Sequence, residues 1–108
     1  MAVWYDAFAT FYDVSLERLY RWYREESVDS LALQPAHRVL DLACGTGQNF
    51  PAIMPFLPEG ELVGLDYSQG MLTRAQRRAD KEGWSNLRLV QADAATVDAD
   101  MLGGEVDA

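Results

Sequence analysis

The stretch that most constrains the fold is residues 39–47, VLDLACGTG, where an apolar run ends in a carboxylate and passes directly into a glycine turn. Residues 38–42 are short, apolar and bounded by turn signals, which predicts a strand buried on both faces of a parallel sheet. Gly45 and Gly47 can adopt a positive φ and leave no side chain between the main chain and a ligand. Residues 48–57 then show helical spacing. A strand, a glycine turn and a helix N-terminus in succession predict a cradle for a small ligand.

The composition sets the size and class of the protein. A chain of 108 residues has room for one domain that buries roughly two thirds of its unfolded surface. The net charge of −8 disfavours non-specific binding to nucleic acid or to an anionic membrane. Cys44 is the only cysteine, so an internal disulfide is excluded. No apolar run approaches ~20 residues and the N-terminus lacks a secretory pattern, so we expect a cytoplasmic protein with no membrane span.

Two more apolar runs predict further buried strands, at residues 61–66 and 86–91. The helix between them should begin after Ser68 as its N-cap and end at Gly83. Its expected inward residues are Met71, Leu72, Ala75 and Ala79, and its expected outward residues are Arg74, Arg77, Arg78 and Lys81. Pro51 and Pro55 predict that the preceding helix is short or kinked.

Each predicted strand ends in or next to a carboxylate, at Asp41, Asp66 and Asp93. Right-handed crossovers lay the strands side by side in the spatial order 3-2-1, which brings their carboxyl ends to one edge of the sheet. The three carboxylates should therefore line a single crevice. Residues 105–108 look like a fourth strand that has only begun.

The N-terminal residues 1–34 predict a helical segment whose role stays open. Its aromatic residues either pack a helix onto the sheet or place Tyr5 or Tyr12 as a lid on the ligand site. A helix that starts after Ser15 should continue to Pro35. His37 has no cysteine or carboxylate at ligand spacing and indicates a loop residue, so we expect no metal site.

The crevice favours a ligand without phosphates. Gly47 followed by Asp66 fits the spacing of a dinucleotide site, in which the acid binds two ribose hydroxyls. Phe50, however, stands where the third glycine of that motif would be. Asp41 and Asp93 would also repel a diphosphate, whereas ribose hydroxyls, an amino group and a positive centre suit them. S-adenosylmethionine has these features.

Residues 39–47, 64–72 and 90–94 resemble, in order and spacing, three successive motifs of class I S-adenosylmethionine-dependent methyltransferases. The resemblance implies a Rossmann-like, three-layer α/β/α domain over 1–108, incomplete and with 1–34 as a helical lid segment. It implies methyl transfer to a small-molecule acceptor, with S-adenosylhomocysteine as product. The N-terminal Tyr-Asp segment resembles the branch that methylates quinone precursors, lipid head groups and other small molecules.

The resemblance also implies roles for individual residues. Gly45 and Gly47 would lie beside the methionine moiety, Asp66 on the ribose hydroxyls, Met71 or Tyr67 against the adenine, and Asp93 with the Ala94 amide on the adenine edge. Ala43 stands where many members have glycine, and a tyrosine of the N-terminal segment can close over the cofactor. The candidate cofactor-binding residues are Tyr12, Asp41, Ala43, Gly45, Gly47, Asp66, Tyr67, Met71, Asp93 and Ala94. No general base is indicated, and Cys44 has no base partner, which favours a small turn residue.

Two other functions stay open: a cofactor-binding module without chemistry of its own, and an NAD-dependent oxidoreductase, against which Phe50 argues. Because the fourth strand is so short, we also expect the edge at residues 39–42 to be unpaired and to favour self-association. The alternative is a compact monomer in which the aromatic N-terminal segment folds over that edge.

Overall fold

A computed structural model describes residues 18–108 of the chain. The contacts divide the chain into two compact units, Met1–Leu31 and Ala32–Ala108, and each is treated by itself. Tyr5 and Tyr12, with the lid expected there, lie outside the described residues. Within 18–108, no helix is long and apolar enough to cross a membrane.

The described part of the first unit is a helix over residues 18–30. It ends at Ser30, whose hydroxyl donates a 2.6 Å hydrogen bond to the carbonyl of Ser27 and so competes with the helical pattern. Ala32 then has a positive φ of 50°, which ends the helical path. The expected continuation to Pro35 is therefore wrong, because the local turn stops the helix before the proline is reached.

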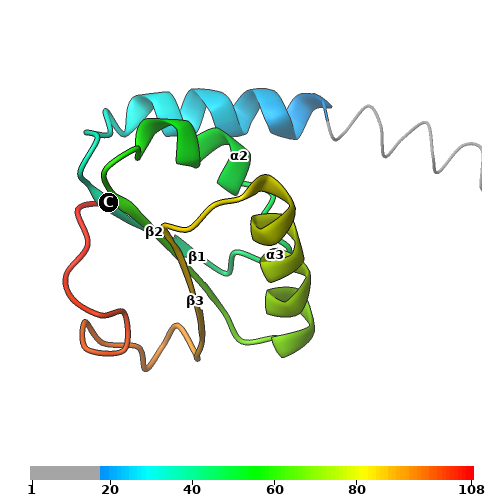
Figure 1. Cartoon of the computed structure of the whole chain (residues 1–108), viewed down its shortest axis with the longest axis vertical. Coiled ribbons are helices and arrows are strands. Elements are labelled where there is room, and N and C mark those ends of the chain that lie inside the picture. The colour runs from blue at the N-terminus through cyan, green and yellow to red at the C-terminus, as the bar shows by residue number, and fades with distance from the viewer. Residues whose placement is uncertain (1–17) are drawn as a thin grey trace, which may run out of the picture. The chain divides into compact units, whose positions relative to one another are not determined.

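The second unit contains a parallel three-stranded sheet (Figure 1). Its strands are β1 (Arg38–Leu42), β2 (Glu61–Asp66) and β3 (Leu87–Gln91), in the spatial order β1-β2-β3. The expected 3-2-1 order is confirmed, and the strand bounds differ from the prediction by one residue at most. β2 has a strand on each side, and its residues 62–65 are all buried.

The helices that connect the strands cover one face of this sheet, since both crossovers run in the same sense (Figure 1). They are α2 (Phe50–Ile53), the 3-10 turn η1 (Met54–Phe56) and α3 (Gln69–Glu82). Pro51 and Pro55 lie in the first turns of α2 and η1. The expected short or kinked helix is confirmed as a short one, since α2 has four residues and passes into the 3-10 turn. The buried side chains of this segment are Phe50, Ile53, Met54 and Leu57.

Helix α3 begins and ends as its sequence predicts. The Ser68 hydroxyl accepts from the backbone N–H of Met71 at 3.3 Å, and Gly83 closes the helix with a φ of 74°. The buried residues are Leu72, Ala75 and Ala79. Met71 was expected inward but is 41% exposed, because it lies in the first turn, where the sheet does not cover it. Arg78 was expected outward but is only partly exposed.

The other face of the sheet is covered by the irregular segment after β3 (Figure 1). The cluster there consists of Val63, Leu65, Ala92 and Leu102, with Leu40, Val90, Val97 and Val106 packed against it. The prediction of burial on both faces is therefore confirmed for β2. It is wrong for the end of β1, where Leu42 is 53% exposed because β1 is an outer strand with less cover.

The last residues pair with the edge of β1 that faces away from β2. The N–H of Asp107 donates to the carbonyl of Arg38 at 2.7 Å, and the N–H of Leu40 donates to the carbonyl of Ala108 at 2.9 Å. These hydrogen bonds place the last residues beside β1, but the sheet has three strands and none is assigned to residues 105–108, so the expected start of a fourth strand stays a prediction. The edge expected to be unpaired is therefore covered at Arg38 and Leu40. Self-association stays a prediction.

Candidate cofactor site

The glycine turn after β1 rests against the end of β2. The N–H of Cys44 donates to the carbonyl of Leu65 at 2.9 Å, and the N–H of Gly45 donates to a carboxylate oxygen of Asp66 at 2.8 Å. The turn is closed internally by a 3.0 Å hydrogen bond from the N–H of Gly47 to the carbonyl of Cys44. Two strand ends therefore fix the turn at the carboxyl edge of the sheet, where ligands of open α/β sheets bind.

The two glycines have left-handed backbones but different surroundings. The φ angles are +59° at Gly45 and +85° at Gly47, and Ala43 also has a positive φ of 54°. A Cβ at Gly45 would meet nothing within 4 Å, whereas a Cβ at Gly47 would lie 2.4 Å from the ring of Phe50. Gly45 thus borders open space. Gly47 leaves room for the buried phenyl ring, a role that the sequence did not predict.

Phe50 occupies the position of the third glycine in the dinucleotide motif. Its ring would lie 3.0 Å from a Cβ at Gly64 in β2 and packs edge-on against Trp84, with ring centroids 6.3 Å apart. The helix therefore approaches the strand through an aromatic ring. The close backbone approach of a pyrophosphate-binding turn is absent here, as the sequence indicated.

Asp41 and Asp66 both border the turn, in different surroundings. Asp41 is only 9% exposed, and burial raises its pKa, partly offset by the Asn49 amide, which donates to both carboxylate oxygens at 3.2 and 3.4 Å. Asp66 accepts from the N–H groups of Gly45 and Ser68, each at 2.8 Å. These bonds orient the Asp66 carboxylate without exhausting its lone pairs.

Cys44 is a buried thiol next to these carboxylates. Burial, reinforced by the charges of Asp41 and Asp66, raises the pKa of Cys44 to about 12. The thiol is therefore protonated at neutral pH, and its Sγ packs 3.1 Å from the Cβ position of Gly64. This environment agrees with a small turn residue rather than a nucleophile.

The remaining expected contacts lie at the neighbouring strand end. The N–H of Ala92 donates to the carbonyl of Asp66 at 3.2 Å, which brings the end of β3 to the end of β2. Asp93 follows and accepts from the N–H of Ala95 at 2.9 Å. Tyr67 is 77% exposed just after β2. Asp93, Ala94, Tyr67 and Met71 thus share this edge of the sheet with Asp66, while their contacts to a cofactor stay predictions, as does that of Tyr12 outside the described residues.

Two residues of the site were missed from the sequence. Asn49 is the hydrogen-bond partner of Asp41, and Arg78 of α3 donates from Nε to the carbonyl of Thr46 at 3.1 Å. No local pattern signals the second contact, because the residues are 32 positions apart.

The polar side chains beside the turn are carboxylates. Among residues 18–108 no group of three His, Cys, Asp or Glu side chains could hold a metal ion. His37 accepts at Nδ1 from the N–H of Gln34 at 3.1 Å, as a loop residue does. The open space at Gly45 lies next to two carboxylates, which attract hydroxyls, an ammonium group and a sulfonium centre.

Residues 39–108, which comprise the sheet, the turn and α3, match the family model described as "Methyltransferase domain". The chain belongs to this methyltransferase family. It is 33% identical over 82 residues to the demethylmenaquinone methyltransferase of Geobacillus kaustophilus, covering 75% of this chain and 35% of that protein. It is 36% identical over 78 residues to the ubiquinone/menaquinone biosynthesis C-methyltransferase UbiE of Coxiella burnetii, covering 70% and 31%. The chain thus spans about a third of these curated relatives.

Solved structures share the fold. The YcgJ protein from Bacillus subtilis superposes with a TM-score of 0.63 at 27% identity, over 68% of this chain and 31% of that one. A SAM-dependent methyltransferase from Aquifex aeolicus gives a TM-score of 0.63 at 20% identity, over 68% and 40%. The expected Rossmann-like α/β fold and the methyltransferase family are both confirmed.

Proposed function

We propose that this methyltransferase chain binds S-adenosylmethionine and serves methyl transfer to a small-molecule acceptor of the quinone type. The observation that carries the proposal is the open space at Gly45, which lies at the ends of two strands beside the carboxylates of Asp41 and Asp66. The relatives named as demethylmenaquinone and ubiquinone/menaquinone methyltransferases support the class of acceptor. We place the activity in the cytoplasm, as the sequence predicts.

Different residues at the turn would bind different parts of the cofactor. Asp66, already oriented by two backbone N–H groups, would accept hydrogen bonds from the ribose hydroxyls. Asp41 is buried and has a raised pKa, so a positive group nearby would stabilise its ionised form. The methionine moiety would lie along Gly45, and Tyr67 or Met71 would pack against the adenine.

When bound, S-adenosylmethionine supplies an electrophilic methyl group on a positively charged sulfur. That methyl group would be passed to the acceptor, which would give up a proton, and S-adenosylhomocysteine would remain as the product. The contribution of this chain is alignment, because the turn is held from two sides and needs little reordering on binding. The role of Tyr12 in cofactor binding, which the family resemblance implies, stays a prediction.

Calorimetry with S-adenosylhomocysteine and NAD tests the proposal. We expect S-adenosylhomocysteine to bind far more tightly than NAD to the 108-residue chain. Asp66→Ala should weaken its binding by about 10- to 150-fold, the equivalent of about 1.5–3 kcal/mol for the loss of charge-assisted hydrogen bonds. Asp100→Ala is the matched control, since it removes the same charge from an exposed position.

NAD binding that equals or exceeds S-adenosylhomocysteine binding would contradict the assignment. A methyl-transfer assay with a demethylated quinol, with the remaining sequence restored, then separates an enzyme from a cofactor-binding module. Tight S-adenosylhomocysteine binding without any transfer would favour the module.

A further inference from the structure

The carbonyl of Thr46 is the point at which the glycine turn contacts α3. The other end of the turn is held by β2, through the carbonyl of Leu65 and the carboxylate of Asp66. At Thr46 the partner is Arg78, whose Nε donates across 3.1 Å. The turn therefore has two anchors, one on a strand and one on a helix.

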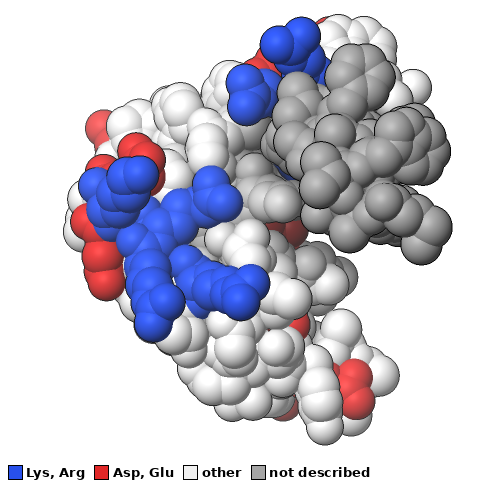
Figure 2. Space-filling model, turned by 90° about the vertical axis from the view of Figure 1, so that its right-hand side faces the viewer, with Lys and Arg blue, Asp and Glu red and all other residues white. Residues whose placement is uncertain are grey.

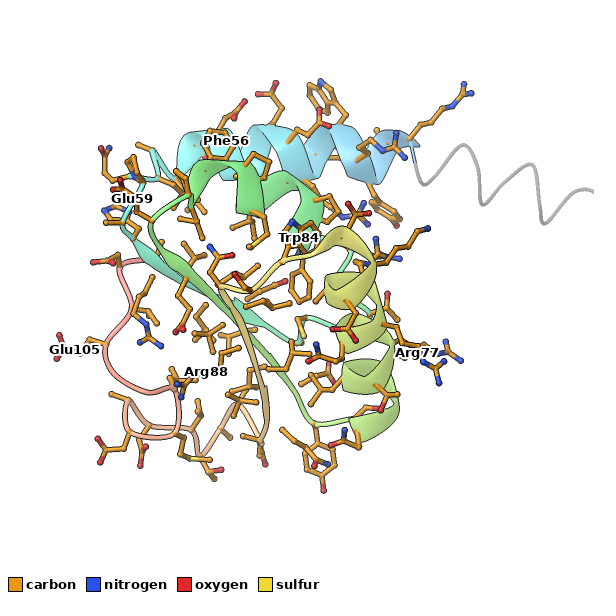
Figure 3. The ribbon with its side chains drawn as sticks, viewed as in Figure 1. Phe56, Glu59, Arg77, Trp84, Arg88 and Glu105 are labelled. Carbon is orange, nitrogen blue, oxygen red and sulfur yellow. The ribbon has the colours of Figure 1, made fainter. Side chains whose placement is uncertain are left out.

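Arg78 belongs to a row of four cations on α3. Arg74, Arg77, Arg78 and Lys81 follow the i, i+3, i+4, i+7 spacing of one helix face, and they line a hollow of about 440 Å³ together with Thr46 and Glu82. Figure 2 shows Lys and Arg side chains gathered on this face. Arg74 and Arg77 are exposed, and Arg77 points away from the sheet (Figure 3). Arg78 alone in this row is partly buried, and its guanidinium reaches the backbone of the turn.

The turn needs such an anchor because it contains two left-handed glycines. Glycine populates many backbone conformations, so the turn can adopt several. Conformations that close the open space at Gly45 cannot bind a ligand, and their population lowers the apparent affinity. A hydrogen bond from a charged, partly buried donor is among the stronger ones available to a carbonyl.

We propose that Arg78 is a positioning residue, which holds the glycine turn in its ligand-binding conformation through the Thr46 carbonyl. The inference rests on the proposed function for its effect on cofactor affinity, but its structural part does not. Arg78 should raise the affinity for the cofactor and leave the chemical step alone.

Amide hydrogen exchange in the ligand-free chain tests the structural part without any cofactor. In Arg78→Met, the exchange of Gly45, Thr46, Gly47 and Gln48 should speed up by about tenfold, as expected when one charge-assisted hydrogen bond is lost. The amides of β2 should keep their rates. Arg77→Met is the matched control on the same helix and should change neither set. Arg78→Lys should restore part of the protection, since an ammonium group can reach the same carbonyl but lacks the planar guanidinium.

Calorimetry with S-adenosylhomocysteine tests the consequence. Arg78→Met should weaken binding by about tenfold, the fold-change expected from that hydrogen bond, and Arg77→Met should leave it unchanged. Unaltered exchange at residues 45–48 in Arg78→Met would overturn the proposal. So would an equal rise in the turn and in β2, which indicates a general loss of stability. If exchange rises only in the turn while the parent chain binds no S-adenosylhomocysteine, the positioning role stands and the proposed function falls.

Discussion

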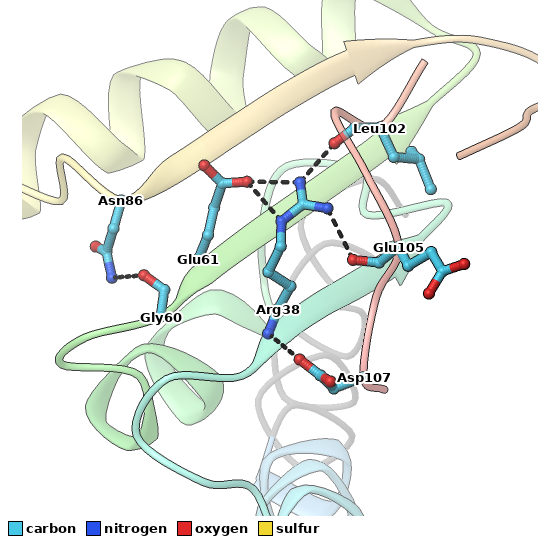
Figure 4. Close-up of polar contacts among 7 residues, drawn as sticks. All are labelled: Arg38, Gly60, Glu61, Asn86, Leu102, Glu105 and Asp107. Atoms are coloured by element: carbon cyan, nitrogen blue, oxygen red, sulfur yellow. Dashed lines mark hydrogen bonds and ion pairs between the residues drawn. The ribbon is translucent and has the colours of Figure 1, made fainter. Parts of the chain in front are cut away.

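Replacing Arg38 by methionine should weaken the attachment of the segment after β3 to the sheet. The Arg38 guanidinium donates from Nε and Nη2 to a carboxylate oxygen of Glu61 at 3.1 and 2.7 Å, from Nη1 to the carbonyl of Glu105 at 3.0 Å, and from Nη2 to the carbonyl of Leu102 (Figure 4). One side chain thus joins β1, β2 and the segment after β3. Methionine keeps most of the apolar stem and removes every one of these bonds.

The expected loss is about 2 kcal/mol of unfolding free energy. Hydrogen bonds from a charged donor contribute about 1.5–3 kcal/mol when buried, but the side chains of Arg38 and Glu61 are 22% and 33% exposed, so water replaces part of each contact. For the same reason, the ion pair between Arg38 and Glu61 contributes only about 0.5–1 kcal/mol to the unfolding free energy. The carbonyls of Leu102 and Glu105 can be partly rehydrated after the substitution, which keeps the total near the lower bound.

Urea denaturation followed by circular dichroism measures this loss, and amide exchange of residues 102–108 locates it. In a domain of this size about 2 kcal/mol corresponds to a fall in Tm of about 8–16 °C. Arg74→Met is the control: it removes one positive charge from an exposed helical position and should change the unfolding free energy by less than about 0.5 kcal/mol. An Arg38→Met chain as stable as this control would refute the reasoning.

Three further predictions concern the turn. Gly45→Ala and Gly47→Ala should both incur about 1–2 kcal/mol of left-handed strain, but Gly47→Ala should lose about 1–3 kcal/mol more against the Phe50 ring; equal urea midpoints for the two would contradict this. Because the pKa of Asp41 is raised, its contribution to stability is complete below the unfolded value of 3.8 and falls as pH rises through the folded pKa. Asp41→Asn should therefore be at least as stable as the parent at pH 7, while it binds S-adenosylhomocysteine less tightly. If Asp41→Asn were less stable than the parent at pH 7 but not in acid, the pH dependence would contradict this prediction. With its pKa near 12, the Cys44 thiol should react with iodoacetamide at pH 8 far more slowly in the folded chain than in urea. Equal alkylation rates in the two states would contradict this. The unfolding free energy should also fall as pH rises from 9.0 towards 12.

Local signals determined the elements of this fold. The strand bounds, the Ser68 cap and the stop at Gly83 depend on residues within one turn or strand of each boundary, so a sequence contains all the information needed to place them. The prolines at positions 51 and 55 predicted a short or kinked helix for the same reason. The strand order followed as well, because right-handed crossovers leave few alternatives.

Tertiary structure decided which residues carry the site. Both glycines of the turn look alike in the sequence, and only the position of the Phe50 ring distinguishes the one that borders open space from the one that accommodates packing. Leu42 and Met71 fit an apolar pattern, but their exposure depends on where the sheet ends and what covers it.

The contacts of Arg38 and Arg78 show the same limit most clearly. Their partners lie 23 to 67 positions away in the chain. On a helix or strand alone, each arginine has the appearance of a solvated charge. A periodic pattern states which face a side chain lies on, whereas the partner it reaches depends on how separate elements pack, and that is determined only when the chain has folded.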